Sequence, residues 1–399
     1  MRISTAHAFE AGIDTLTRRQ AAIASLQEQL SSGKRVARAS DDPTAAARAE
    51  RATAAIGRAD TSQRAVEASR VAMTQTESAL GDASSLLQRA RELVVSAGNP
   101  SYSDSDRKSI ADELQSLRDQ LLITANQSDG AGTYLFGGQG ATEKPFIDTT
   151  SGVQYAGAPG QTLTEAPTSL PLTSDGQASW LSARTGNGVF VTSAAASVTG
   201  ATIDNGRVSD PSALTGAAYT LQFSVAAGAT TYAVLKNGLP TAVTAAPYVS
   251  GQAVTVDGMT VSVSGIPANG DAFALSPSTP TLSVFAMLDK TIASLSTANK
   301  TGSQMAQATA DSLRDVDAVL GNLQTARAAA GAVLNRIDME TDRLGNQKLA
   351  GQTERSNAED VDMVHAISDF QNMQNGYDAA LKSYAMVQRL SLFQYVNGS

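Results

Sequence analysis

Two glycine-containing segments bring this sequence nearest to a nucleotide-binding motif. Residues 130–140, GAGTYLFGGQG, have the glycine content of a phosphate-binding loop, and residues 32–35, SGKR, place a lysine after a glycine. A P-loop needs Gly-x-x-x-x-Gly-Lys-[Ser/Thr], because its backbone N–H groups surround the phosphates and its lysine reaches them. The first segment lacks this order, and Glu28 and Arg35 replace the required Gly and Ser/Thr around the second. We interpret the first as a turn between a helix and a β-rich domain, with three residues packed at the junction: Tyr134, Leu135 and Phe136.

Carboxylates and imidazoles were the next candidates for metal binding or proton transfer. Asp41 and Asp42 are adjacent, but they directly precede Pro43 and an alanine-rich stretch, a pattern typical of a helix N-terminus. His7 and His365 are the only histidines and belong to opposite ends of the chain, so we interpret them as surface or packing residues. Gly-x-Ser-x-Gly and His-Glu-x-x-His motifs are both missing from the sequence. We therefore expect no enzyme activity, no cofactor and no metal.

Composition narrows the functional classes that remain possible for this chain. The 399 residues are enough for two or three domains, and the net charge of −8 comes from acids and bases mixed along the chain, without a basic stripe for nucleic acid. Cysteine is absent, which excludes disulfides and thiolate chemistry. The N-terminal residues include Glu10 and Asp14 where a signal peptide would be apolar. No run approaches the ~18 apolar residues of a membrane span. We expect neither nucleic acid nor a membrane as a partner.

Charge density divides the sequence into three zones. Residues 146–283 contain 10 charged residues among 138, whereas the flanks contain 58 among 261. The middle also holds 9 of the 12 prolines and the only tryptophan, Trp180. The composition changes once on entering this middle region and once on leaving it, which indicates a domain inserted between two helical arms. We predict an elongated α+β protein, with long α-helical bundle or coiled-coil arms from both termini and an inserted β-rich outer domain.

Heptad spacing predicts long helices in both arms. Residues 9–30 repeat apolar positions every seven residues, and a second helix from Pro43 to residue 97 repeats Ala52, Ala59, Val66, Met73, Leu80, Leu87 and Val94. Serine, threonine and alanine form a companion row, which lets helices approach closely. Residues 104–128 and 313–344 predict further helices, and a last one carries Ile367, Phe370 and Leu381. In the middle, alternating strands flank Asn237-Gly238 and Asp257-Gly258, so we predict hairpins there, one of them over 251–265.

Glutamines interrupt the apolar rows of both terminal helices: Gln20 and Gln27 in the first, Gln374 and Gln388 in the last. A polar residue at such a position costs stability and specifies partners, and two helices of this kind paired alone would be marginal in water. A closed bundle within one chain is one way to cover these rows. We favour coverage by neighbouring subunits, which predicts a subunit interface made of Phe9, Ile13, Leu16, Ile23, Leu30, Ile367, Phe370 and Leu381.

Several short segments resemble one bacterial family. MRIST at the start, LSSGKRVARASDDPTAAA at 30–47, GTYLFGG and PF within 132–146, and LSLFQYVNG at the end are similar to the flagellar hook-associated proteins of the hook–filament junction (FlgL-type), relatives of flagellin. The resemblance covers both arms. Residues 248–277 resemble modules of the family's outer domains, whereas 150–215 match no known module.

This resemblance implies a structural role. Family members leave the cell unfolded through the flagellar type III channel, without a cleaved signal peptide, and form a ring at the hook tip, in the extracellular flagellum. The implied partners are further copies of the chain, a hook-associated protein on the hook side, flagellin on the filament side and an export chaperone. The chaperone would contact Tyr377, Leu381, Leu390, Leu392 and Phe393.

The same resemblance implies a place for each domain. Residues 1–42 with 350–399 would be terminal helices that form an assembly tube and are disordered in the monomer. Residues 43–145 with 284–349 would be a helical rod, and 146–283 the β-rich outer domain, in one or two subdomains. We expect a hinge between the first helix and the rod, made of Gly33, Asp41, Asp42 and Pro43, so that one part orders late while the other folds early.

Two alternatives remain at this point. A flagellin-like filament subunit would share both arms but would elongate into long filaments by itself. A carbohydrate-binding adhesin displayed on helical stalks would use Trp180 and Tyr155 as sugar platforms, although a single tryptophan is more often part of a core.

Overall fold

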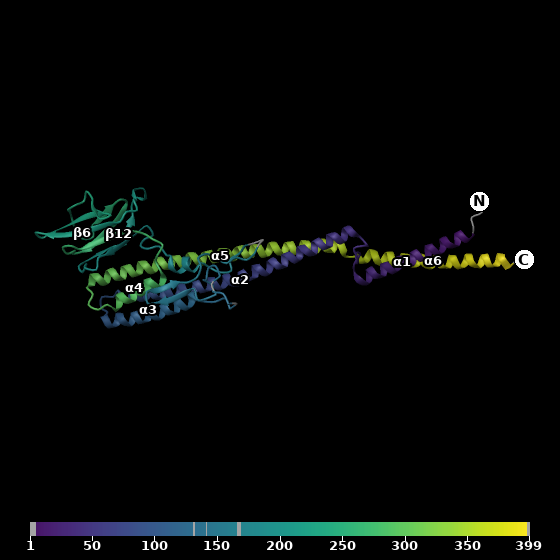
Figure 1. Cartoon of the computed structure of the whole chain (residues 1–399), viewed down its shortest axis with the longest axis horizontal. Coiled ribbons are helices and arrows are strands. Elements are labelled where there is room, and N and C mark those ends of the chain that lie inside the picture. The colour runs from purple at the N-terminus through teal and green to yellow at the C-terminus, as the bar shows by residue number, and fades with distance from the viewer. Residues whose placement is uncertain (1–4, 131, 141, 166–168, 397–399) are drawn as a thin grey trace. The chain divides into compact units, whose positions relative to one another are not determined.

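The computed structural model describes the backbone of residues 5–396 apart from 131, 141 and 166–168, and it describes the side chains of the two chain ends for His7 and from residue 10 to residue 386. It confirms the α+β class, with long helices near both ends of the sequence and β-sheets in the middle (Figure 1). The chain forms two compact units, Met1–Arg64 with Glu340–Ser399 and Ala65–Met339, which we describe separately.

Six α-helices occur in the described residues. They are α1 (Thr5–Ser32), α2 (Pro43–Ala97), α3 (Asp104–Ala125), α4 (Val284–Ser296), α5 (Gly302–Glu359) and α6 (Met363–Val396). Helices α2 and α5 contribute residues to both units. Helix α5 extends beyond the predicted pattern at 313–344 and continues to Glu359.

The seven-residue rows of α2 are buried as the spacing predicts. The large row from Val66 to Val94 and the small row Ser69, Thr76, Ala83 and Ala90 both lie in the interior. In the larger unit, α5 runs antiparallel beside α2. Ion pairs connect the two helices at three levels, Arg70–Asp338 (2.6 Å), Glu77–Arg327 (2.6 Å) and Arg91–Asp317 (2.7 Å). The Ser69 hydroxyl of the small row donates instead to the Pro171 carbonyl (2.6 Å).

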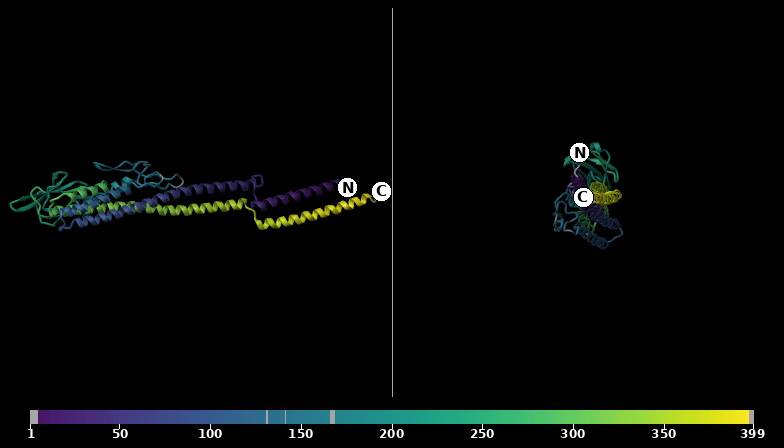
Figure 2. Two further views of the ribbon diagram at one scale, coloured as in Figure 1. Left: turned by 90° about the horizontal axis from the view of Figure 1, so that it is seen from below. Right: turned by 90° about the vertical axis from the view of Figure 1, so that its right-hand side faces the viewer.

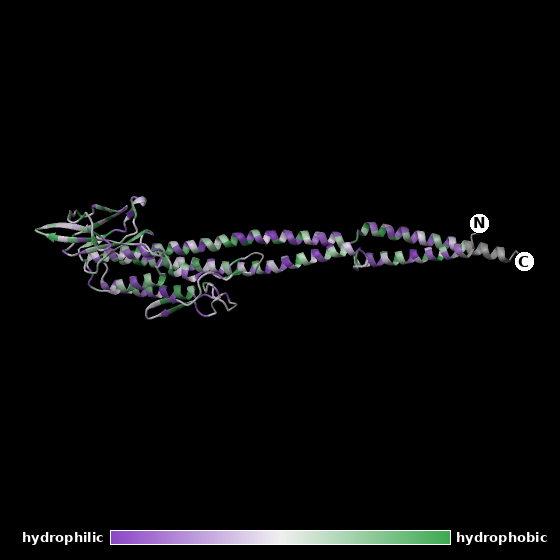
Figure 3. Cartoon of the chain, turned by 45° about the horizontal axis from the view of Figure 1, so that its top comes forward, coloured by the Kyte–Doolittle hydropathy of each residue, from purple (hydrophilic) through white to green (hydrophobic). Residues whose placement is uncertain are grey.

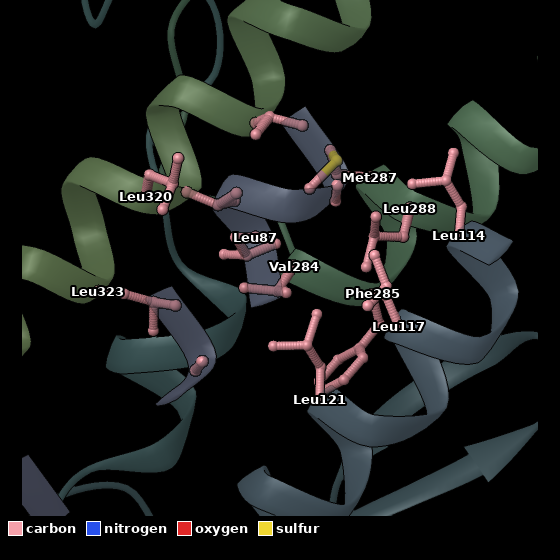
Figure 4. Packing of buried hydrophobic residues seen from close by; sticks show 14 of the residues in the cluster. Leu87, Leu114, Leu117, Leu121, Val284, Phe285, Met287, Leu288, Leu320 and Leu323 are labelled. Carbon is pink, nitrogen blue, oxygen red and sulfur yellow. The ribbon is translucent and has the colours of Figure 1, made fainter. Parts of the chain in front are cut away.

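Helices α2, α3, α4 and α5 share one core in the larger unit (Figure 4). The labelled side chains Leu87, Leu121, Phe285 and Leu323 point toward one another from these four helices. Helix α3 begins at a capping box, in which Ser103 and Asp106 exchange hydrogen bonds, and this fixes where the helix starts.

The segment from 146 to 183 packs into this helical core. It contains the hairpin of β1 (Phe146–Thr149) and β2 (Gly152–Tyr155) and the π-helix η1 (Gln177–Leu181). Phe146 and Trp180 are both buried, and the Trp180 ring stacks on Phe285 with ring centroids 6.0 Å apart. The change of composition at residue 146 therefore does not coincide with the change of core.

A second core holds two antiparallel sheets together. The first sheet has the order β3-β12-β6-β7-β8, with β9 also paired to β7, and the second has the order β10-β11-β4, with β5 also paired to β11. The bounds are β3 (Phe190–Ala194), β4 (Ala201–Ile203), β5 (Arg207–Val208), β6 (Tyr219–Ala226), β7 (Ala229–Lys236), β8 (Leu239–Pro240), β9 (Ala246–Pro247), β10 (Ala253–Val256), β11 (Met259–Gly265) and β12 (Ala272–Pro277). The 3₁₀ turn η2 (Pro211–Ala213) precedes β6. We call residues 190–277 the β-domain.

The two predicted hairpin turns are confirmed. Asn237-Gly238 and Asp257-Gly258 both adopt positive φ at both positions, 50° and 80° in the first and 41° and 80° in the second. Two consecutive positive φ values define the type I′ turn, whose twist matches that of the flanking strands, and Asn-Gly and Asp-Gly adopt it at low cost.

Side chains of α5 hold the β-domain against the helices. The Gln307 side-chain oxygen accepts a hydrogen bond from the Ile203 N–H (2.8 Å), and Arg314 donates to the Thr192 carbonyl (3.2 Å). Asp311 and Asp315 lie on either side of Arg314, at 2.9 and 3.0 Å. Burial raises the pKa of the Asp311 carboxyl, against the opposing charge of Arg314.

No described helix combines the length and the apolar character that crossing a bilayer would take.

The packing of the core predicts that substitutions at two positions of α2 differ strongly in their effect on the free energy of unfolding. Leu87→Ala removes a fully buried side chain and should lower the free energy of unfolding by about 2–5 kcal/mol. Val95→Ala, on the exposed side of the same helix, should change it by less than about 0.5 kcal/mol. Denaturant unfolding followed by far-UV circular dichroism measures both. Equal effects of the two substitutions would contradict the packing described here.

Candidate assembly surface on the terminal helices

Helices α1 and α6 lie side by side and run antiparallel (Figure 2, left). The Arg19 guanidinium donates to the Gly376 carbonyl (2.5 Å), and Gly12 faces the ring of Tyr384. A Cβ on Gly376 would lie only 2.7 Å from the Arg19 side chain, so the absence of a side chain there allows the contact. One glycine in each helix thus receives a large side chain from the other, and these two contacts fix the register of the pair.

Each helix turns one heptad row toward the other. The row on α1 is Leu16, Ile23 and Leu30, and the row on α6 is Phe370, Tyr377 and Tyr384. All six residues are half-buried and none is fully buried. A pair of helices without a third element can shield only the innermost part of each row. The contact between α1 and α6 is therefore incomplete within one chain.

A second heptad row on each helix stays exposed. We call Ile13, Gln20 and Gln27 on α1, with Ile367, Gln374 and Leu381 on α6, the exposed rows. The exposed fractions of Ile13, Ile367 and Leu381 are 44%, 45% and 40%. Apolar and polar residues alternate along both helices in Figure 3.

The two exposed rows lie on the same face of the pair. Each exposed row is offset from its own inner row by about one seventh of a turn, in the same rotational sense when a helix is viewed from its N-terminus. Because the helices are antiparallel, this common sense places both rows on one side. The register set by Arg19 and Gly376 also brings Gln20 level with Gln374.

The opposite side of the pair carries polar residues on both helices, together with the exposed side chains of Met373 and Met386 on α6. Arg18 and Ser25 of α1 and His365 and Asp369 of α6 are exposed there by the same geometry. His365 lies 3.7 Å from Asp369, and His7 lies 3.9 Å from Glu10, so each histidine contacts a carboxylate of its own helix. Among the described residues, no group of three or more histidines and carboxylates could hold a metal ion.

The residues that the sequence assigned to interfaces fall into three groups. Ile13, Ile367 and Leu381 belong to the exposed rows. Leu16, Ile23, Leu30, Phe370 and Tyr377 belong to the half-buried rows between α1 and α6. The side chains of Phe9, Leu390, Leu392 and Phe393 lie outside the described part of the chain. Gly12 and Gly376 were missed, although a glycine inside a long heptad pattern is itself a signal of close helix approach.

The loop between α1 and α2 is paired with the break between α5 and α6. The Arg35 and Val36 N–H groups both donate to the Glu359 carbonyl (2.6 and 3.2 Å), and the Val361 N–H donates to the Gly33 carbonyl (3.0 Å). Gly33 has φ +71°, a conformation that favours glycine. The Lys34 ammonium lies 2.8 Å from the Glu359 carboxylate. We call residues 33–42 with 359–362 the joint, since the two breaks hold each other.

The adjacent carboxylates of the joint cap two different turns. Asp42 accepts hydrogen bonds from the N–H groups of Thr44 (3.1 Å) and Ala45 (3.0 Å) and is the N-cap of α2, with Pro43 next to it. Asp41 instead accepts from the N–H groups of Ala37 and Arg38 and closes the preceding turn. The Ala45 N–H, followed by the Thr44 hydroxyl, lowers the pKa of Asp42 from 3.8 to about 2.

Within the glycine-rich segment 130–140, residues 135–138 are buried. Leu135 and Phe136 are buried, and a Cβ on Gly138 would lie 1.7 Å from the Ala158 carbonyl oxygen. Tyr155 donates to the Phe136 carbonyl (3.1 Å), and burial raises the pKa of this phenol to about 12. Trp180 is fully buried and forms no open sugar platform, whereas Tyr155 is half-buried with its hydroxyl bonded to the Phe136 carbonyl.

Known families match both arms of the sequence. Models of the bacterial flagellin N-terminal and C-terminal helical regions match residues 3–141 and 313–396. The chain is similar to flagellar hook-associated protein 3 of Salmonella typhimurium, 30% identical over 403 residues that cover 99% of each chain. It is also similar to a crystal structure of the flagellar junction protein FlgL from Legionella pneumophila, with TM-score 0.65 and 29% identity, covering 71% of this chain and 97% of that one. Phase 1 flagellin of Salmonella naestved is 40% identical over only 116 residues, 29% of this chain and 23% of flagellin. These findings confirm the resemblance noted in the sequence.

The cap of α2 predicts a pH-dependent stability. Because the pKa of Asp42 is lower in the folded chain than its ordinary value of 3.8, its contribution is complete above that value and is lost as the pH falls toward about 2. Thermal unfolding should therefore show Asp42→Ala as destabilised at neutral pH, with the difference from the original chain shrinking as the pH falls toward 2, where the protonated carboxyl keeps only a neutral oxygen acceptor. Asp42→Asn keeps a neutral oxygen acceptor and is the control, since part of its cap should persist at every pH. A difference that stays constant with pH would contradict this role of Asp42.

Proposed function

The chain belongs to the family of flagellar hook-associated protein 3, and we propose that it is the structural adaptor that connects the bacterial flagellar hook to the filament. The similarity over the full length of a curated member supports this role, as does the similarity to a protein described as the flagellar junction protein. The proposed location is the extracellular flagellum, and the proposed role is mechanical and involves no catalysis.

The exposed rows are the observation that carries the proposal. Apolar side chains on one face of a two-helix pair, left 40–45% exposed, gain free energy when a neighbouring molecule covers them. Further copies of the chain, arranged as a ring, are the proposed neighbours. A hook-associated protein on the hook side and flagellin on the filament side would continue the same packing. Gln20 and Gln374, level with each other, would then restrict which registers of the neighbour are compatible.

We propose the joint as the hinge of this assembly. Gly33, Asp41, Asp42 and Pro43 separate α1 from α2, and the paired break at 359–362 separates α5 from α6. A movement of α1 relative to α2 would therefore be accompanied by one of α6 relative to α5. In this proposal α1 and α6 form the assembly tube, α2 to α5 form the rod together with the β1–β2 hairpin and η1 that pack into their core, and the β-domain is the outer domain.

Export in an unfolded state by the flagellar type III system, with a chaperone bound near the C-terminus, completes the proposal. Tyr377 and Leu381 lie on adjacent rows of α6, one half-buried and one exposed, so a chaperone bound there would compete with α1. The absence of cysteine agrees with passage of an unfolded chain through a narrow channel, because no disulfide can cross-link the chain.

The alternative roles are less well supported. The alignment with phase 1 flagellin covers only 29% of this chain, whereas the similarity to hook-associated protein 3 extends over 99%. The adhesin alternative required Trp180 and Tyr155 as sugar platforms, and Trp180 is part of the helical core.

A deletion strain tests the proposed role. Cells without the gene should carry hooks but release filament protein into the medium, and the original gene should restore motility. The double variant Ile13→Asp with Leu381→Asp should fail to restore it, because each carboxylate buried without a partner costs about 3–5 kcal/mol. Ser25→Asp, on the polar face of α1, is the control and should restore motility. Normal filaments on the deletion strain would refute the junction role, and normal motility of the double variant would refute the exposed rows as an interface.

The half-buried rows also predict the behaviour of the dissolved monomer. Amide hydrogens of α1 and α6 should exchange close to the rate of an unstructured chain, whereas those of α2 between Leu80 and Val94 should be protected. Hydrogen exchange on dilute protein, read by mass spectrometry or NMR, makes the comparison within one sample. Equal protection of α1 and of the core part of α2 would show that neighbours are not needed to order the terminal helices.

A further inference from the structure

A long stretch of the β-domain is nearly without charge. Between residues 211 and 270 the only charged residues are Lys236 and Asp257. These two pair with each other at 2.7 Å, and the Tyr219 hydroxyl also donates to Asp257. No unpaired charge from this stretch therefore faces the solvent. A surface of this kind neither attracts nor repels a charged partner and favours contact with another uncharged surface.

Most edges of the two sheets are closed by specific side chains or prolines. Arg314 and Gln307 of α5 bond to Thr192 at the edge strand β3 and to Ile203 of β4. The short strands β8 and β9 contain Pro240 and Pro247, which have no N–H to donate. These devices are the usual protection of a sheet against pairing with another chain.

Strand β10 lacks such protection. It pairs with β11 through the type I′ turn at Asp257-Gly258, with Val256 opposite Met259. In this hairpin geometry Val256 and Val254 bond to β11, so the N–H and C=O groups of Ala253 and Thr255 point to the free side. The side chains of Thr255 and Thr260 meet at 3.1 Å, as expected for the intervening non-bonded pair. Within the described residues, no hydrogen bond reaches the outward groups of Ala253 and Thr255.

Two strongly exposed aliphatic side chains lie beyond the start of β10, at the same end of its hairpin with β11. Val249 is 59% exposed and Ile266 is 81% exposed. Their segments are adjacent, because the Gly251 N–H donates to the Val263 carbonyl (2.8 Å) and the Gly265 N–H donates to the Ser250 hydroxyl (2.9 Å). An open strand edge next to exposed aliphatic groups and without charge is a typical site for addition of a strand from another chain.

We propose that the β10 edge binds the β10 edge of a second copy of this chain, so that the two β10–β11 sheets join into one. The sequence of the edge favours this occupant. In an antiparallel pair centred on Val254, Ala253 of one copy lies opposite Thr255 of the other, all four outward N–H groups gain carbonyl partners, and no charge is buried. The match requires no surface other than the one already described.

The contact is small and acts where copies are crowded. A four-residue edge buries far less area than a stable interface needs, so the pairing depends on a high local concentration of the chain. The assembly described under the proposed function supplies this concentration, so the inference rests on the proposed function. A two-fold contact joins copies in pairs and cannot close a ring, so it is distinct from the contact made by the exposed rows.

Cross-linking of the full chain tests the proposal directly, because the natural chain has no cysteine. Thr255→Cys places one thiol on the edge, and Ser224→Cys places one at an exposed position of β6 on the other sheet. At high protein concentration, a short bis-maleimide should cross-link the first variant at least about tenfold more efficiently than the second. Equal yields would overturn the proposal.

A charge at the edge provides the second measurement. In sedimentation velocity at the same high protein concentration, the original chain should form a weak, concentration-dependent dimer that Thr255→Lys abolishes and Ser224→Lys leaves unchanged, while circular dichroism confirms that both variants fold. A dimer that persists in Thr255→Lys would overturn the proposal. The Thr255→Lys variant should also restore motility to the deletion strain. This result separates the edge contact from the proposed junction role, because loss of the edge contact leaves the junction role intact.

Discussion

Two α-helices without a third element cannot bury a wide apolar stripe, and this constraint governs the smaller unit. Helix α2 in the larger unit gives the comparison for α1 and α6. Between Leu80 and Val94 this helix is covered by α3, α4 and α5, and its large and small rows are fully buried. Helices α1 and α6 have only each other, so their inner rows are half-buried and their outer rows are exposed. The free energy of burial that the larger unit gains within one chain is left, in the smaller unit, for contacts between molecules.

The joint shows how such incomplete helices remain attached to a stable body. Backbone hydrogen bonds from Arg35, Val36 and Val361 connect two chain breaks that are more than 300 residues apart in sequence. Capping by Asp42 ends the joint sharply on the α2 side, and Asp362 does the same for α6 by accepting from the N–H groups of Val364 and His365. Because each helix has its own start signal, α1 and α6 can lose order without unwinding α2 or α5.

Local patterns predicted much of this structure and failed where contacts are distant in sequence. The heptads of α2 and the two type I′ turns follow from spacing and from dipeptides whose backbone preferences are strong, so both were predictable. The packing of 146–183 into the helical core was not, because Phe146 and Trp180 meet Phe285 across more than a hundred residues and composition carries no trace of that contact. For the same reason the loop at 33–42 could be recognised as a break, but its partner at 359–361 could not. The interface residues were identified as apolar, yet which of them face the partner helix depends on the register set by Arg19 and Gly376.

The distribution of charge separates two kinds of surface in this chain. Along the helices, ion pairs such as Arg91–Asp317 and Lys348–Asp60 lie at the margins of packed rows, where they are solvated and add little stability but limit lateral slippage. In the β-domain the corresponding positions carry serine, threonine and small apolar residues, and orientation is fixed instead by Arg314 and Gln307 at the boundary with α5. The helical surfaces are thus selective through charge and register, whereas the β-domain surface is selective only through backbone hydrogen bonds and shape. A subunit that must bind different neighbours at its terminal helices benefits from the first kind of selectivity, since a wrong neighbour there leaves a charge or a glutamine without a partner.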